Sequence, residues 1–423
     1  MSECRRWVFG RGCALGLAEL HGGCDTSDGS GRSALSTLGQ GHGSMSEGDD
    51  KVLRAVLRLH LSAGVGPLTF WKLVEAFGGP AEAAAAGPAG WARVDGVGPK
   101  TIEGLLAVRD EDVQQELDLA AEHGAAVVTA FDADYPVSLV NLPDRPPVLY
   151  IRGRLRASDA VALAVVGSRR CTYYGLEQAH RLGGLLGRAG MTVISGGARG
   201  IDTAAHRGAL EAGGRTIAVM GCGLTQTYPS ENAELFERII ADGRGAVLSE
   251  LPMRTAVLGG NFPTRNRIIS GLSLGVLIVE AARKSGSLIT AREAAEQGKE
   301  VFALPGRVDS PLSQGANQLI RDGAILVQDL DDILEHLGAV GAKLSTDDSA
   351  GAAALPPGLD ETETALASAL AAGPLSLDEL LRRTRLDSGR ATGAMTMLVL
   401  KGVVAQQPGN VFARKSPPSP GPA

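Results

Sequence analysis

The chain has 423 residues, of which 44% are apolar, and this length is enough to bury one large core plus one or two small ones, so we expect two to four domains. Its formal net charge of −6 excludes a generally basic nucleic-acid coat, so any nucleic-acid site must be a local basic patch. The five cysteines form no CxxC pair or other metal-ligand spacing, and a disulfide framework is not expected in a chain this long. We therefore predict a cytoplasmic protein with no bound metal.

Residues 1–44 are predicted to be a disordered or misassigned leader. Arg5 and Arg6 precede a weakly apolar patch, but Arg11 and Glu19 interrupt it before it reaches the length of a signal peptide. Residues 24–43 are rich in Gly, Ser, Thr and Asp and show no periodicity, which is typical of disorder. An amphipathic helix follows Met45, so we expect the natural start at Met45.

Residues 45–126 are predicted to form a helical domain. A GlyValGlyPro sequence occurs at Gly64–Pro67 and again at Gly96–Pro99, which is an internal repeat of helix, glycine hairpin and helix. Such helix-hairpin-helix (SAM-like) units can bring backbone amides close to a phosphate, and Lys100 is placed to assist the second copy. The alternative is that both copies only make tight turns, with Pro67 and Pro99 in the first helical position.

Residues 127–337 are predicted to form an extended Rossmann-like α/β domain with a parallel sheet. Two short strands around prolines lead into it, between Val127 and Arg154. Helix-like segments then separate nearly all of the apolar runs that follow, and these runs read as strands buried on both faces. The expected strands are Val161–Val166, Met191–Ser195, Thr216–Met220, Gly245–Ser249, Gly275–Glu280 and Glu300–Ala303. Neither GxGxxG nor GxxxxGK[ST] occurs, so no dinucleotide or P-loop cofactor is expected.

Glycine and arginine residues follow the first two of these strands. The loops contain Gly167, Ser168 and Arg169, and then Ser195, Gly196, Gly197, Arg199 and Gly200. Because the carboxyl ends of parallel strands meet at one sheet edge, we predict an anion site there, with Arg169 and Arg199 on its rim. We expect Asp202 to be the N-cap of the following helix.

A third group of polar residues lies between Asn261 and Ser273 and contains Arg265, Asn266 and Arg267. Residues two apart on a helix lie roughly 200° apart, so the two arginines are not expected to serve one site equally. One should reach the ligand while the other pairs with a buried carboxylate, for which Glu250 and Glu280 are the candidates. Ser287, in a loop of small residues that opens another helix, completes the predicted site.

Residues 338–357 are predicted to be a linker rich in Ala, Gly, Ser and Asp, and residues 415–423 a tail. Between them, residues 358–414 are expected to form three helices and a hairpin, the pattern of a winged helix. The first helix is expected over Asp360–Ala371, Ser376 with Glu379 is expected to cap the second, and either Asp387 or Ser388 the third. The third helix offers only Arg390 and Lys401 as cations, so protein contact or packing is favoured over sequence-specific binding of a duplex.

The ordered set of motifs resembles the DNA-processing protein family called DprA or Smf. The set comprises GlySerArg, SerGlyGlyAlaArgGlyIleAsp, TyrProSerGluAsn, PheProThrArgAsnArg, SerGlySerLeuIleThrAla and LeuProGly. The resemblance implies a single-stranded DNA-binding recombination mediator that protects incoming DNA and loads RecA in natural transformation. It also implies homodimerisation, competition with single-strand binding protein, and no catalytic residue. By this resemblance Arg169 is the principal DNA-binding residue, with Arg199, Arg265 and Arg267 as further contacts.

The alternative is a Rossmann-like nucleotide-binding protein or a nucleoside-monophosphate phosphoribohydrolase. In such an enzyme Asp202, Glu250 and Glu280 could supply the acid and the base. The ProGlyGlyXaaGlyThrXaaXaaGlu signature of those enzymes is absent. No part of the chain is expected to enter a membrane.

Overall fold

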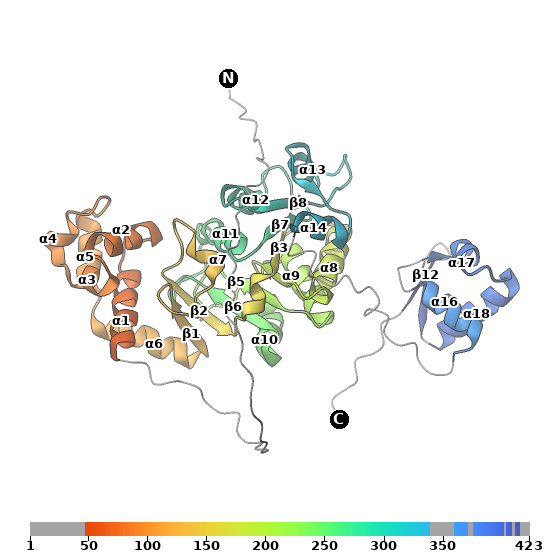
Figure 1. Cartoon of the computed structure of the whole chain (residues 1–423), viewed down its shortest axis with the longest axis horizontal. Coiled ribbons are helices and arrows are strands. Elements are labelled where there is room, and N and C mark those ends of the chain that lie inside the picture. The colour runs from red at the N-terminus through yellow and green to blue at the C-terminus, as the bar shows by residue number, and fades with distance from the viewer. Residues whose placement is uncertain (1–46, 339–358, 371–374, 402, 408–410, 415–423) are drawn as a thin grey trace, which may run out of the picture. The chain divides into compact units, whose positions relative to one another are not determined.

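The computed structural model describes residues 47–338, 359–370, 375–401, 403–407 and 411–414 (Figure 1). The predicted leader, Met45, residues 339–357 of the predicted linker and the predicted tail lie outside the described residues. By its internal contacts the chain divides into two compact units, residues 1–344 and residues 345–423.

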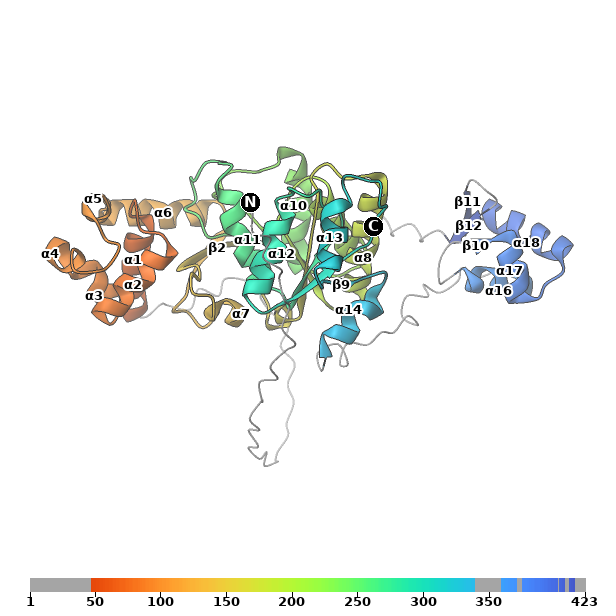
Figure 2. The same ribbon diagram turned by 90° about the horizontal axis from the view of Figure 1, so that it is seen from above.

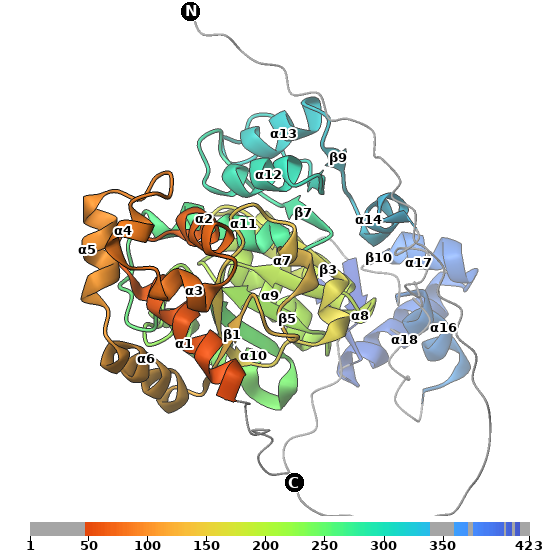
Figure 3. The same ribbon diagram turned by 60° about the vertical axis from the view of Figure 1, so that its left-hand side comes forward.

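The first unit begins with six helices, which form one group in Figure 3. They are α1 (Glu47–Leu61), α2 (Pro67–Phe77), α3 (Pro80–Ala85), α4 (Gly87–Trp91), α5 (Pro99–Ala107) and α6 (Asp110–Glu122). Pro67 and Pro99 each occupy the first helical position, as expected for both copies of the repeat. The two copies lie against each other, because a Cβ built on Gly64 would be 3.1 Å from the Thr101 hydroxyl.

A nine-stranded sheet forms the centre of this unit. Its strands are β1 (Ala125–Thr129), β2 (Val148–Gly153), β3 (Ala162–Val166), β4 (Thr192–Ser195), β5 (Thr216–Val219), β6 (Gly245–Ser249), β7 (Gly275–Ile278), β8 (Glu300–Ala303) and β9 (Ile325–Leu326). Their order is β1-β2-β6-β5-β4-β3-β7-β8-β9. The seven strands from β6 to β9 are parallel, whereas β1 and β2 add an antiparallel edge. The Rossmann-like expectation is therefore confirmed, and the sheet is mostly rather than wholly parallel.

Helices cover both faces of the sheet. They are α7 (Val137–Val140), α8 (Tyr173–Arg188), α9 (Ile201–Glu211), α10 (Ala233–Ile240), α11 (Asn261–Gly271), α12 (Ser287–Glu296), α13 (Gln314–Arg321) and α14 (Leu330–His336). Along β3 the buried side chains alternate, so that Leu163 and Val165 pack with α8 and α9, while Ala164 packs with α11 and α12. Figure 2 shows α11, α12 and α13 together on one side of the sheet. The apolar runs are thus strands buried on both faces.

The helical group is joined to the sheet by buried polar contacts as well as by apolar packing. The Met253 amide donates to the Glu116 carboxylate of α6 at 2.7 Å. The Trp71 indole of α2 donates to the Arg145 carbonyl at 2.9 Å, and the Arg145 guanidinium lies 3.6 Å above the same ring. These contacts hold the helices against the loop after β6 and the loop before β2.

The second unit contains α16 (Glu361–Ala369), α17 (Leu377–Thr384) and α18 (Ser388–Leu400). Asp360 caps the first helix, Ser376 caps the second as expected, and Asp387 rather than Ser388 caps the third. The predicted hairpin is β11 (Val404–Gln407) paired with β12 (Val411–Arg414), and its ProGly turn lies outside the described residues. A short strand that the sequence pattern does not predict, β10 (Leu375–Ser376), adds to β12 and completes a winged helix.

Candidate nucleic-acid interface

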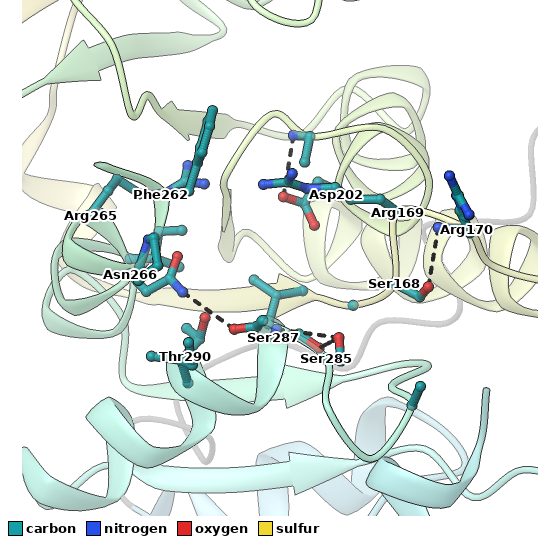
Figure 4. Close-up of a pocket in the computed structure, with 18 of the residues that line it drawn as sticks. Ser168, Arg169, Arg170, Asp202, Phe262, Arg265, Asn266, Ser285, Ser287 and Thr290 are labelled. Carbon is teal, nitrogen blue, oxygen red and sulfur yellow. Dashed lines mark hydrogen bonds between the residues drawn. The ribbon is translucent and has the colours of Figure 1, made fainter. Parts of the chain in front are cut away.

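A cavity of about 830 Å³ opens at the carboxyl ends of β3 and β7. In the sheet, β4, β5 and β6 lie in sequence order on one side of β3, and β7, β8 and β9 lie in sequence order on its other side. Between β3 and β7 the strand order reverses, and loops on either side diverge to leave a crevice. Figure 4 shows side chains from the loops after β3 and β7 and from α9, α11 and α12 around this cavity. The predicted sheet edge therefore carries a real pocket.

The loops after β3 and β4 are packed closely against each other. The Ser168 amide donates to the Glu280 carbonyl at 2.7 Å, which ties the first loop to the end of β7. Gly200 has φ +79, and a Cβ built there would lie 2.5 Å from the Ser168 carbonyl oxygen. A side chain at residue 200 would thus collide with the Ser168–Arg169 backbone, which explains the glycine.

Asp202 is not the N-cap of α9, contrary to the sequence-based expectation, because the cap position is occupied by Gly200. The Asp202 carboxylate turns back and accepts the amides of Gly196 and Ala198 at 3.1 and 3.3 Å. Burial raises the pKa of Asp202, while the nearby Arg265 guanidinium opposes that shift. Asp202 therefore shapes the loop after β4 and balances a buried cation.

Arg265 lies on the inner wall of the cavity and is 4% exposed. Its guanidinium donates to the carbonyls of Gly196, at 2.9 Å, and Val219. Burial lowers its pKa to about 10, a shift that the Asp202 carboxylate opposes. Its Nε has no hydrogen-bond partner among the described residues. Arg265 thus supplies positive charge from within the wall, and its Nη1 holds the loop after β4 and the end of β5.

Two cations and two aromatic rings form a row along the rim, which we call the cation–aromatic wall: Arg169, Phe262, Tyr228 and Arg199. The Arg169 guanidinium lies 4.9 Å from the centre of the Phe262 ring. The Phe262 and Tyr228 rings are 5.5 Å apart, and Arg199 lies 5.7 Å from the Tyr228 ring. Arg169 is exposed, whereas Arg199 also forms a bidentate pair with Glu231 at 2.6 and 2.9 Å. The two rings, tilted by 41° to each other, present an apolar surface beside an exposed cation.

The opposite wall comes from the loop after β7 and from the start of α12. Lys284 is exposed there, and the hydroxyls of Ser285 and Ser287 are 2.7 Å apart. The Asn266 amide donates to the Gly286 carbonyl at 3.4 Å, which links this loop to α11 (Figure 4). Hydroxyls, a cation and the amino ends of α11 and α12 together favour an anionic ligand.

Arg267 does not line the cavity. Its guanidinium forms a buried ion pair with Glu250, at 2.6 Å, and contacts Asp144 at 2.8 Å. The prediction that one of the two arginines of α11 pairs with Glu250 or Glu280 is therefore confirmed for Arg267 and Glu250. The other carboxylate, Glu280, instead accepts from the Thr172 amide and hydroxyl at 2.8 and 2.6 Å and so holds the start of α8.

The predicted site residues thus separate into three groups. Those that line the cavity are Gly167, Ser168, Arg169, Arg265, Asn266 and Ser287. Those that form the supporting loop or its rim are Ser195, Gly196, Gly197, Arg199 and Gly200, and Arg267 is held elsewhere. The lining residues that were not predicted as contacts include Arg170, Tyr228, Phe262 and Lys284. Arg170 follows the predicted Arg169, while Tyr228 and Phe262 each precede a proline, and this adjacency is the signal that could have found them. Lys284 lies three residues before the predicted Ser287.

Within residues 47–338 and the described part of the C-terminal unit, no three His, Cys, Asp or Glu side chains are grouped as metal ligands. The helices of the same residues are all too short or too polar to cross a membrane.

Three family models match the chain in consecutive segments. The model described as DNA recombination-mediator protein A matches residues 126–338, the DprA-like N-terminal HHH domain matches residues 50–118, and the DprA winged helix domain matches residues 350–410. Together these matches follow the helical, Rossmann-like and winged-helix parts in order.

Individual relatives agree with the models. Protein Smf of Synechocystis sp. is 34% identical over 83% of this chain and 96% of its own length. The DNA processing protein DprA of Streptococcus pneumoniae is 44% identical over 48% of this chain and 71% of its own length. The X-ray structure of DprA from the same organism superposes with a TM-score of 0.58 at 33% identity, covering 67% of this chain and 97% of that one. The chain therefore belongs to the DprA/Smf family of DNA-processing proteins.

Proposed function

We propose that the cavity binds single-stranded DNA, and that the protein is a recombination mediator that protects incoming strands and loads RecA onto them in natural transformation. The observation that carries the proposal is the cation–aromatic wall. Arg169 and Phe262, 4.9 Å apart, offer one phosphate contact and one ring to the same nucleotide. Single-strand binders combine these two features, because phosphates supply affinity and rings stack on unpaired bases.

The charge around the cavity supports this proposal. Arg169, Arg170 and Lys284 are exposed on its lining, and the buried Arg265 lies behind them. The one carboxylate on the lining, Asp202, is occupied by two loop amides and lies beside Arg265. The net field inside is therefore positive although the whole chain is acidic. A base that is free of its partner strand can enter the crevice, whereas a stacked pair cannot, which favours single strands over duplex.

The helical region is a weaker candidate for phosphate binding. Residues 47–122 carry seven lysines and arginines against thirteen aspartates and glutamates. Lys100 is exposed beside the second hairpin, but Lys72 next to that hairpin pairs with Asp95 at 2.7 Å. We therefore place the single-strand site in the α/β crevice and leave the hairpins as turns between helices.

The enzymatic alternative has no support in the geometry. Of the three carboxylates that could serve as acid or base, Glu250 is paired with Arg267, Glu280 holds Thr172, and Asp202 accepts loop amides. Only Asp202 lines the cavity. We therefore assign no catalytic residue and no cofactor.

The first test is the binding of a labelled single strand and of a duplex of the same length across a salt series. We expect the single strand to bind more tightly, its affinity to fall steeply with salt, and Arg169→Ala to weaken it by about 1–3 kcal/mol, the range for a charge-assisted contact. Arg321→Ala removes an exposed cation of α13 and is the matched control. Absence of single-strand binding by the wild type would refute the proposal, and binding unaffected by Arg169→Ala would move the site elsewhere.

The mediator role is tested on single strands coated with single-strand binding protein. We expect the wild type to restore the ATPase activity of RecA on such strands and Arg169→Ala to fail. A wild type that binds single strands but leaves RecA inhibited would separate DNA binding from RecA loading.

Two further experiments test the remaining proposals. Sedimentation at several protein concentrations tests the proposed homodimer, and fractionation of cells tests the proposed cytoplasmic location.

A further inference from the structure

The winged helix carries a compact group of exposed arginines. Arg382, Arg383, Arg385 and Arg390 lie within nine residues, at the end of α17, in the turn after it and in the first turn of α18, and all four are exposed. We call them the arginine cluster. We propose that the arginine cluster is a second nucleic-acid site, which binds the phosphate backbone of duplex DNA without reading its sequence.

The arrangement of the two helices favours a duplex. Only residues 385–387 separate α17 from α18, the short connection of a helix-turn-helix. In this motif the second helix enters the major groove by its amino end, while the first crosses the backbone. Cations at the end of α17 and at the start of α18 therefore lie where a duplex presents phosphates.

The exposed side chains of α18 explain why sequence would not be read. After Arg390, the exposed residues of the helix are Thr392, Gly393, Thr396 and Met397. The hydroxyls of Thr392 and Thr396 donate back to the carbonyls of Ser388 and Thr392, at 2.8 and 2.9 Å. The other cation of this helix region, Lys401, is held 2.7 Å from the buried Glu363. What remains is a surface of two threonines, a glycine and a methionine, which presents no free donor set for bases.

Single strands fit this surface poorly. The only aromatic residue between residues 359 and 414 is Phe412, which is 6% exposed and belongs to the core of the unit. Unpaired bases would find no ring on which to stack there. The arginine cluster therefore suits a duplex, whereas the crevice, which has the Phe262 and Tyr228 rings, suits a single strand.

The backbone at Arg385 supplies an independent observation. Arg385 ends α17 with φ 54, and it is the only residue other than glycine with a positive φ in the described part of the chain. This position is usually glycine, because a Cβ is strained there. An arginine at this position keeps a positive charge there although the backbone is strained, and such strain is typical of functional sites.

The test uses the full chain with a labelled blunt duplex and, in parallel, a labelled single strand. The triple variant Arg382→Ala, Arg383→Ala, Arg390→Ala should bind duplex at least about tenfold more weakly, and the slope of log K against log salt should fall by about 0.9 for each phosphate that the variant no longer neutralises. Its single-strand affinity should stay within about twofold of the wild type. The control removes three exposed arginines of the first unit, Arg207, Arg238 and Arg321, and should retain duplex binding.

A second variant separates binding from folding. Arg385→Gly relieves the left-handed strain, so it should melt at a temperature at or above that of the wild type while binding duplex several-fold more weakly. Arg169→Ala should show the reverse pattern, with single-strand binding weakened and duplex binding unchanged. A failure of the crevice site therefore appears in one assay and a failure of the arginine cluster in the other.

Three results would overturn the inference: no duplex binding by the wild type, equal duplex affinity in the triple variant and its control, or loss of duplex binding in Arg169→Ala. The first would leave the arginine cluster as a surface for an acidic protein. The third would place duplex binding in the crevice.

Discussion

Arg267 and Glu250 form a buried ion pair in which Nη2 and Oε2 are 2.6 Å apart and the two side chains are 7% and 9% exposed. The same guanidinium reaches Asp144 at 2.8 Å and its backbone carbonyl at 2.9 Å. The pair joins α11, the end of β6 and the loop before β2. Arg267 is only two residues from Arg265 in the sequence, but its side chain lies in the protein interior and not in the cavity.

Removing one partner of this pair should destabilise the fold. Arg267→Ala leaves a buried carboxylate without its cation, so we expect the free energy of unfolding to fall by about 3–5 kcal/mol. The double variant Arg267→Met, Glu250→Met should recover most of that loss, because apolar residues of similar size need no partner. Urea unfolding measures both. If Arg267→Ala kept full stability but lost single-strand binding, Arg267 would have to be a DNA contact.

The Phe262 ring should contribute stacking energy. Phe262→Leu keeps an apolar side chain but removes the ring, so we expect the affinity for a single strand to fall by about 1–3 kcal/mol. Phe131→Leu is the matched control, since Phe131 is a partly exposed ring that packs on Trp71 instead. Anisotropy titrations of these variants and of Arg169→Ala with Phe262→Leu form a double-mutant cycle. Purely additive effects would mean that Arg169 and Phe262 do not act on the same nucleotide.

Two glycines with the same backbone conformation test the packing of the loops. Gly200 and Gly190 both have φ +79, but only at Gly200 would a Cβ meet another atom within 4 Å. Gly190→Ala should therefore cost only the left-handed penalty, about 1–2 kcal/mol. Gly200→Ala should cost more and should also weaken single-strand binding, because Ser168 and Arg169 must shift. Thermal melts and titrations compare them, and equal effects of the two substitutions would argue against close packing of the loops.

Acid should destabilise the protein through two buried histidines. Burial lowers the pKa of His206 to about 3 and that of His60 to about 4. The unfolded chain protonates both below about pH 6.5, so the folded state binds fewer protons there. Stability is therefore full above pH 6.5 and falls toward pH 5, with a slope that approaches about 1.4 kcal/mol per pH unit for each histidine.

Denaturant titrations between pH 7.5 and pH 5 measure this slope. His206→Asn should remove about half of it, since an amide can still meet the Thr216 hydroxyl that lies 2.6 Å from His206 Nδ1. A slope that does not change in His206→Asn would assign the acid sensitivity to other groups.

Much of the fold follows from local signals in the sequence. Gly245–Ser249 and Glu300–Ala303 are strands with the predicted bounds, because short apolar runs that end at glycine or proline have few other ways to be buried. Asp360, Ser376 and Asp387 begin helices because their side chains satisfy free amides within the next few residues. Burial of a short apolar run and capping of a helix each depend on only a few neighbouring residues, so the amino-acid sequence alone is sufficient to predict them.

The partners of the polar side chains were decided by the tertiary structure. The pattern of α11 indicates that Arg265 and Arg267 point apart, but Glu250 and Asp144 lie 17 and 123 residues from Arg267 along the chain, and only the folded sheet brings them to it. In the same way Asp202 accepts loop amides rather than capping its own helix, and Tyr228 meets Phe262 from another loop. The sequence by itself determined most of the strands and helices, apart from the two-residue strands β9 and β10, and at which sheet edge they place glycines and cations. The tertiary structure decided which of those cations face the crevice, because pairing across the fold depends on distances that local propensities do not contain.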